Sequence, residues 1–210
     1  MNQPFRTIAW LLMPLLGACV SLSHAGENDA TLPFDPARIC RLSLNDLPRS
    51  ISIRQGENVW IGYDLEKATV LKVWQSPAGN PGLIIRSFKA YSKGTSWFEA
   101  KETEGWSLSK GGRKAPLAVR YLGSTQQDKH FLLRWELSQA GKKFVLSERI
   151  PMSITDADKK VTREVRVEFI EPGEVLSHPM IKREGWELTN SEGQLVPTLT
   201  GTQWHRLSLP

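Results

Sequence analysis

The sequence predicts an all-β protein, an antiparallel β-sandwich of roughly 10–12 short strands with little helix. Segments rich in β-branched and aromatic residues recur along the chain, and Gly, Pro and Asn turns separate them. Apolar and polar residues alternate most cleanly over residues 161–170. Beyond residue 25, no segment has the periodicity of an amphipathic helix of three turns.

Residues 1–25 predict a signal peptide for export. Arg6 is the only charged residue among them, and residues 7–22 are mostly apolar. Ser23-His24-Ala25 then places small residues at the two positions that a signal peptidase reads. The apolar run is short for a spanning helix. We therefore expect an exported protein with a periplasmic location.

Cys19 leaves a second route of export open. Leu16-Gly17-Ala18-Cys19 resembles a bacterial lipobox, in which the cysteine is acylated and becomes the new N-terminus. Acylation would give an outer-membrane lipoprotein that meets the membrane only through its lipid anchor, whereas cleavage after Ala25 would discard Cys19. Either route leaves Cys40 without a disulfide partner. A small buried hydrophobe is the expected role of Cys40, and a thiol nucleophile is the alternative.

The domain organisation follows from the turn-forming residues. Residues 26–38 carry Gly, Asn, Asp, Thr and two prolines and predict a flexible lead-in. Residues 39–210 are expected to form a single β-sandwich domain. The stretch 151–160 is the best internal boundary, but the short strands on both sides of it favour one domain.

The central element is a β-hairpin over residues 59–75. One arm ends at Tyr63, the other covers residues 69–74, and the polar segment 64–67 forms the turn. Trp60 and Trp74 lie on opposite arms and are expected to meet across the pair.

Further strands are predicted on both sides of this hairpin. Glycines mark tight turns at Gly111-Gly112 and at Gly141, and residues 123–129 predict a polar loop. In the segment 161–170, Val161, Val165, Val167 and Phe169 are expected to face the core. The remaining predicted strands are 50–54, 83–88, 117–122, 130–137, 143–150, 180–181, 186–188, 194–199 and 204–209.

Composition and charge exclude several classes of protein. The chain is 40% hydrophobic and 23% charged, which is typical of a globular protein and not of a disordered one. The formal net charge is +5, and basic residues alternate with acidic ones, as over residues 163–168. This pattern predicts a solvated surface and no binding of nucleic acid.

Motifs for metals, cofactors and nucleophilic catalysis are missing from the sequence. His130, His178 and His205 are isolated, and there is no Cys-x-x-Cys pair, haem-attachment motif, Gly-x-Gly-x-x-Gly, Walker loop or Gly-x-Ser-x-Gly elbow. We therefore expect no metal, no cofactor and no catalytic set built on these motifs.

Tryptophan is the unusual feature of the composition, with seven indoles after residue 25. Trp60, Trp74 and Trp135 lie in apolar strands and are expected in the core. The other indoles have polar neighbours and, where partly exposed, could stack on sugar rings or anchor a partner protein, but core packing is favoured for each. These candidate ligand-binding indoles are Trp97, Trp106, Trp186 and Trp204.

Two carboxylates lie near these indoles. Glu99 and Glu104 lie between Trp97 and Trp106 in the sequence, and Glu102 lies between the two glutamates. Cleavage of glycosides uses two acids about 5–10 Å apart across a cleft, so this region is a candidate site for sugar binding or hydrolysis. A solvated loop is the alternative.

Several loose motifs between residues 45 and 150 carry a resemblance. They are Tyr63-Asp64-x-Glu66, Leu71-Lys72-Val73-Trp74, Ser92-Lys93-Gly94-x-x-Trp97, Tyr121-Leu122-Gly123, Leu133-x-Trp135-Glu136-Leu137 and Glu148-Arg149. This region resembles a β-sandwich module of large secreted proteins in Verrucomicrobia, Planctomycetes and Bacteroidetes, where the module accompanies c-type cytochrome domains and sugar-dehydrogenase-like propellers. The resemblance implies export, a sandwich and a carbohydrate or redox context, but no catalytic residue.

Together these observations predict an exported, non-catalytic β-sandwich. It would bind a ligand such as a carbohydrate, or dock onto a c-type cytochrome or quinoprotein dehydrogenase of the cell envelope. Two alternatives stay open: a carbohydrate-active enzyme that uses Glu99 and Glu104, and a structural envelope lipoprotein.

Overall fold

A computed structural model describes residues 38–101, 105–153, 161–178, 180–183 and 185–209, all of which belong to one compact unit. The predicted signal peptide over residues 1–25, the lipobox cysteine Cys19 and the carboxylate of Glu104 lie outside the described residues. So do the lead-in up to residue 37 and most of the 151–160 boundary.

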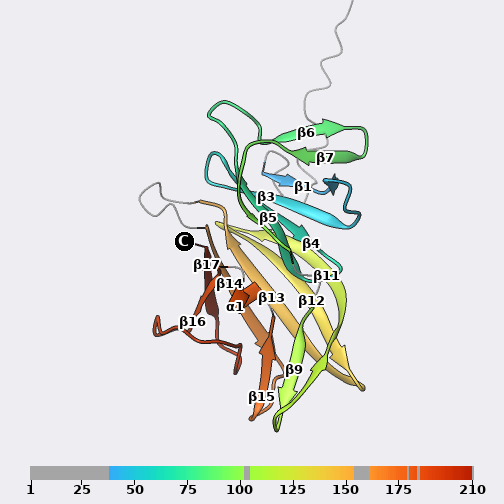
Figure 1. Ribbon diagram of the computed structural model, residues 1–210, viewed down its shortest axis with the longest axis vertical. Coiled ribbons are helices and arrows are strands. Elements are labelled where there is room, and N and C mark those ends of the chain that lie inside the picture. Colours follow the sequence, from blue (N-terminus) through green and yellow to red (C-terminus); the bar gives the residue numbers. More distant parts are fainter. Residues whose placement is uncertain (1–37, 102–104, 154–160, 179, 184, 210) are drawn as a thin grey trace, which may run out of the picture. The chain divides into compact units, whose positions relative to one another are not determined.

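The predicted all-β class is confirmed, and most strands belong to two large antiparallel sheets. The six-stranded sheet contains the long neighbouring strands drawn from yellow to orange in Figure 1. In spatial order its strands are β11 (Ala118–Gln127), β12 (His130–Gln139), β13 (Lys142–Pro151), β14 (Val161–Glu168), β17 (His205–Leu209) and β16 (Glu187–Thr189). In the five-stranded sheet they are β1 (Ile39–Cys40), β3 (Ser50–Gln55), β4 (Val59–Asp64), β5 (Thr69–Gln75) and β8 (Thr95–Glu99).

Two three-stranded sheets complete the strands of the described residues. One has the order β2 (Ser43–Leu44), β7 (Lys89–Ser92) and β6 (Leu83–Arg86), and its β2–β7 pair is parallel. The other has the order β10 (Arg113–Pro116), β9 (Ser107–Lys110) and β15 (Glu174–Ser177). A helical turn, α1 (Met180–Arg183), follows β15. The described residues form seventeen strands, more than expected, because several have only two to four residues.

The main core lies between the inner faces of the two large sheets. Side chains alternate along β12 and β14, so that every second residue enters one shared hydrophobic cluster. Ile53, Ile61 and Val73 of the five-stranded sheet join the same cluster. The two sheets therefore pack face to face, as the sandwich prediction requires.

A second core covers the other face of the five-stranded sheet. Trp60 and Trp74 are direct partners on β4 and β5, and their rings stack with centroids 6.0 Å apart and planes 8° apart. Leu44, Leu83 and Ala90 of the small β2–β7–β6 sheet pack against them. The predicted hairpin is therefore confirmed, and its indoles join a core separate from that of Trp135.

Four local predictions differ from the structure. The expected polar loop at 123–129 instead extends β11 to Gln127, beyond a bulge at Tyr121 and Gly123. The expected strand at 180–181 is the first turn of α1, and residues 194–199 form only isolated bridges. Phe169 does not face the core: its φ of 66° ends the extended backbone of β14, and the side chain is 66% exposed.

Gly94 and Gly123 offer a test of close backbone packing. Both have a φ of 145°, but a Cβ on Gly94 would lie 2.0 Å from the carbonyl oxygen of Gln75, whereas a Cβ on Gly123 would meet nothing within 4 Å. Each alanine variant carries a conformational cost of about 1–3 kcal/mol. In urea unfolding, we expect Gly94→Ala to lose at least about 1 kcal/mol more free energy of unfolding than Gly123→Ala, because the backbone near Gln75 must shift to admit the Cβ. Equal losses would contradict the close approach.

Candidate functional site

Trp97 and Glu99 lie together on the outer face of β8, an edge strand of the five-stranded sheet. The Trp97 side chain is 38% exposed, in agreement with its prediction as a partly exposed indole. The Glu99 carboxylate accepts a hydrogen bond from Lys72 Nζ at 3.1 Å. Since Glu104 lies outside the described residues, the structure supplies no carboxylate partner across a cleft for Glu99.

Trp106 and Trp186 are buried, as the favoured core packing requires, so neither ring is free to bind a ligand. The indole nitrogen of Trp106 donates to the carbonyl oxygen of Ala68 at 3.0 Å. Trp186 packs edge-on against Phe98, with ring centroids 5.7 Å apart.

Trp204 is partly exposed beside the outer face of the six-stranded sheet, as expected. The guanidinium groups of Arg149 and Arg166 lie 4.6 and 4.8 Å from its ring centroid. Such cation–π contacts already occupy the ring, which leaves less of it for a ligand. The predicted indoles are therefore divided between β8, the core and the six-stranded sheet, and they do not form one site.

A cleft of about 530 Å³ opens between the two large sheets at one end of the sandwich. The start of β3, the turn after β4 and the first residues of β11 form its walls. These segments are far apart in the sequence, and no residue of the cleft was among the predicted site residues. The cleft is lined by Arg41, Arg49, Ser50, Ile51, Leu65, Glu66, Val119, Arg120 and Tyr121.

Guanidinium groups dominate the charge of this cleft. Arg49 Nε lies 3.7 Å from the carboxylate of Glu66. Arg120 donates from Nε and Nη2 to both oxygens of Glu136, at 3.2 and 3.1 Å, and these hydrogen bonds raise the pKa of Arg120. Arg41 donates to Ser124 Oγ. Arg120 and Glu136 are direct partners on the face of the sheet opposite Tyr121, so Arg41 and Arg49 are the cations beside the Tyr121 ring, against one lining carboxylate.

The floor of the cleft is held by the main core. The Tyr121 ring lies 5.9 Å from the buried ring of Trp135, and Trp135 Nε1 donates to the carbonyl oxygen of Leu65 at 3.0 Å. These contacts join β11 and the β4–β5 turn to the same buried indole. Planar cations beside a partly exposed aromatic ring are the groups that bind carboxylates and the faces of sugar rings.

Arg163 and Glu148 form an ion pair inside the main core. Arg163 Nη1 donates to both oxygens of the Glu148 carboxylate at 2.7 Å, and both residues are fully buried. The Arg163 guanidinium also lies 4.7 Å from the centroid of the Trp186 ring and 5.9 Å from that of Tyr63. The pair thereby joins two strands of one sheet to β4 and to the segment before β16.

Residues around this pair carry further buried polar groups. Burial and the negative charge of Glu148 hold the pKa of Tyr63 well above its ordinary value. The Tyr63 hydroxyl, Arg163 Nε, His178 Nε2 and Trp186 Nε1 are buried without a hydrogen bond to another described residue. Such a concentration of polar groups is typical of interiors that hold buried water.

The interleaved charges over residues 163–168 predict a solvated surface and do not indicate this buried pair. That interpretation is wrong for Arg163. The residue is two positions from both Val161 and Val165, so alternation places it on their core-facing side. Glu148 likewise lies between the core residues Leu146 and Ile150. Alternation applied to the charged residues would have found both.

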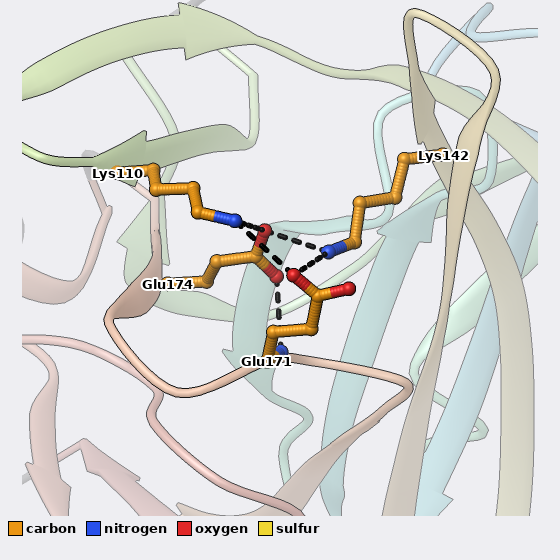
Figure 2. Close-up of polar contacts among 4 residues, drawn as sticks. All are labelled: Lys110, Lys142, Glu171 and Glu174. Carbon is orange, nitrogen blue, oxygen red and sulfur yellow. Dashed lines mark hydrogen bonds and ion pairs between the residues drawn. The ribbon is translucent and has the colours of Figure 1, made fainter.

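A second charge cluster ties the β9–β15 sheet to the β12–β13 hairpin (Figure 2). The buried Glu174 carboxylate accepts hydrogen bonds from Lys142 at 2.6 Å and Lys110 at 3.3 Å, and Glu171 pairs with the same lysines at 2.9 and 3.1 Å. Burial alone would raise the pKa of Glu174, but the lysine contacts lower it. Two cations and two anions neutralise one another, so this cluster is a structural clamp. The predicted turn after Lys110 is confirmed as the β9–β10 hairpin.

The described residues contain no group of three or more His, Cys, Asp or Glu side chains that could hold a metal ion. Within the same part of the chain, no helix is long and apolar enough to cross a membrane. Comparison of the sequence with protein-family models and curated proteins, and comparison with solved structures, finds no match. The arginine-lined cleft is therefore the candidate site on geometric grounds.

The buried pair predicts an asymmetry between single and double substitutions. Arg163→Leu leaves the Glu148 carboxylate buried without its cation and should lower the free energy of unfolding by about 3–5 kcal/mol. The double variant Glu148→Leu/Arg163→Leu removes both charges and should lose less than Arg163→Leu alone. Arg134→Leu on the exposed side of β12 is the control, with a change within about 0.5 kcal/mol in urea unfolding. A double variant as unstable as the sum of the single ones would contradict this account.

His178 predicts a dependence of stability on pH. Burial, and then the charge of Arg163, lower its pKa from 6.5 to about 3, so the folded protein holds the imidazole neutral while the unfolded chain takes up a proton. Stability should therefore fall as the pH drops below 6.5, by about 1.4 kcal/mol between about pH 8 and about pH 5.5 from His178 alone. Burial lowers the pKa of His205 as well, which acts in the same direction.

Urea unfolding at both pH values measures this slope. The His178→Asn variant should show a smaller slope than the parent protein, whatever its absolute stability. His130→Asn, at the end of β12, should retain the full slope. An unchanged slope in His178→Asn would refute the assignment.

Proposed function

We propose that the protein is an exported, non-catalytic β-sandwich module that binds a carbohydrate bearing carboxylate or phosphate groups. The observation that carries this proposal is the cleft of about 530 Å³ that Arg41, Arg49 and Tyr121 line. Its volume falls in the range of small-molecule sites.

The charge of the cleft selects an anionic ligand. The guanidinium group is planar and can donate two parallel hydrogen bonds to a carboxylate or phosphate. Arg49 pairs with the exposed Glu66, and this partner can be exchanged for a ligand anion at modest cost. A neutral sugar would gain the ring contact with Tyr121 but not these charged hydrogen bonds.

The architecture supports binding rather than catalysis. The cleft contains one lining carboxylate, Glu66, whereas hydrolysis of a glycosidic bond uses two. The rival proposal of an enzyme acting through Glu99 and Glu104 has less support, because Glu99 pairs with Lys72 on the outer face of β8.

Titration with oligosaccharides tests the proposal. Oligomers of galacturonic acid should bind at least about tenfold more tightly than neutral oligomers of galactose, because a charged hydrogen bond contributes about 1.5–3 kcal/mol. Calorimetry measures both affinities, and quenching of Trp135 fluorescence beneath Tyr121 reports occupancy of the cleft. Affinity should fall as salt is added.

Variants locate the binding site. Arg49→Ala should weaken binding of the acidic oligomers by about tenfold. Arg113→Ala removes an exposed arginine of β10 and should leave the affinity unchanged. The proposal fails if acidic and neutral oligomers bind equally, or if the Arg49 variant binds as the parent does.

A further inference from the structure

The β6–β7 hairpin exposes an unusual amount of apolar surface. Phe88 in the turn is 84% exposed, Ile85 is 53% exposed and Ile84 is 39% exposed. They account for three of the seven large hydrophobic side chains exposed among the described residues, and they lie within five consecutive positions. Scattered exposed hydrophobics need no explanation, but a cluster at one tip indicates an interaction surface.

The apolar side chains point to more than one side of the hairpin. Ile84 and Ile85 are consecutive in β6, so their side chains leave opposite faces of the strand. β6 is also the edge strand of its sheet, and the turn of the hairpin, with Ser87 at a φ of 54°, carries Phe88 beyond both strands. Figure 1 shows the hairpin as a narrow two-stranded ribbon.

Cations adjoin this tip. Arg86 and Lys89 lie beside the turn and are exposed, and the segment 83–93 contains no acidic residue. Lys89 pairs with Asp46, which also accepts a hydrogen bond from Tyr91 at 3.2 Å. Asp46 offsets the charge of Lys89, so Arg86 leaves the tip with a net positive charge.

The base of the hairpin is rigid. Leu83 and Ala90 are buried in the second core against Trp60 and Trp74. Trp74 Nε1 donates to the carbonyl oxygen of Gly82 at 2.8 Å, directly before β6 begins. Phe88 is therefore presented on a fixed support, which reduces the conformational entropy lost on binding.

We propose that the tip of the β6–β7 hairpin inserts into the surface of an anionic lipid bilayer, with Phe88 and Ile85 in the acyl boundary and Arg86 at the lipid headgroups. Charge complementarity favours this occupant, because cations adjoin the apolar tip. The geometry favours lipid over protein: a fluid bilayer can surround a ribbon that is apolar on both faces, whereas a folded partner covers one face. Insertion of the hairpin into the bilayer does not depend on ligand binding in the cleft.

Hydrogen exchange with mass spectrometry tests the insertion on the full chain. Vesicles of phosphatidylglycerol mixed with phosphatidylcholine should slow amide exchange in the peptide spanning residues 83–93 by at least about threefold, whereas pure phosphatidylcholine vesicles should not. The β12–β13 hairpin serves as the internal reference and should be unaffected. Because the readout is local, attachment of the chain through any other segment does not produce it.

Two matched variants complete the experiment. Phe88→Ser should abolish the slowing of amide exchange at residues 83–93. In sedimentation with the anionic vesicles, it should lower the fraction of protein bound through the hairpin by about fivefold. Phe169→Ser removes another exposed phenylalanine, outside the hairpin, and should behave as the parent protein does. The proposal is overturned if anionic vesicles do not slow amide exchange in the hairpin, or if exchange stays slow in Phe88→Ser. It is also overturned if exchange slows only when a partner protein is added in place of vesicles.

Discussion

The ion pair between Arg163 and Glu148 is the constraint on which the arrangement of the sandwich depends. Removing two charges from water is costly, and the cost is offset only if the charges meet within the protein. Glu148 pairs with Val165 in the ladder between β13 and β14, so Arg163 is its diagonal neighbour on the same face. A slip of one residue would send one charge to solvent and strand the other in the core. The pair therefore makes the register of these central strands costly to change.

The same pair organises the layers around it. Arg163 lies near the rings of Tyr63 and Trp186, so the five-stranded sheet and the C-terminal segment both meet the six-stranded sheet at one charged group. Tyr63 in turn contacts Trp135, at 6.3 Å between ring centroids, and Trp135 supports the floor of the cleft through Tyr121 and Leu65. The rigidity of the candidate binding site thus derives from contacts that continue into the buried pair.

Sequence patterns predicted the fold much better than they predicted the candidate site. Alternation and turn residues predicted the central hairpin and the long strands β12 to β14, because these signals are local. They could not separate the buried Trp106 and Trp186 from the exposed Trp97, because burial depends on which strands lie opposite, and the charge run hid Arg163 although its alternation with valines was visible. The cleft brings Arg49, Glu66 and Tyr121 together, and only the topology of the two sheets makes them neighbours.

The separation of the two hydrophobic cores has a consequence for cooperativity. The smaller core contains five buried residues, two of them the stacked indoles on the back of the five-stranded sheet. So small an interface contributes less free energy than the main core, so the β2–β7–β6 layer, although fixed in the native state, is expected to unfold at a lower urea concentration than the sandwich beneath it. Substitutions in this layer should therefore change its own stability while the sandwich stays folded.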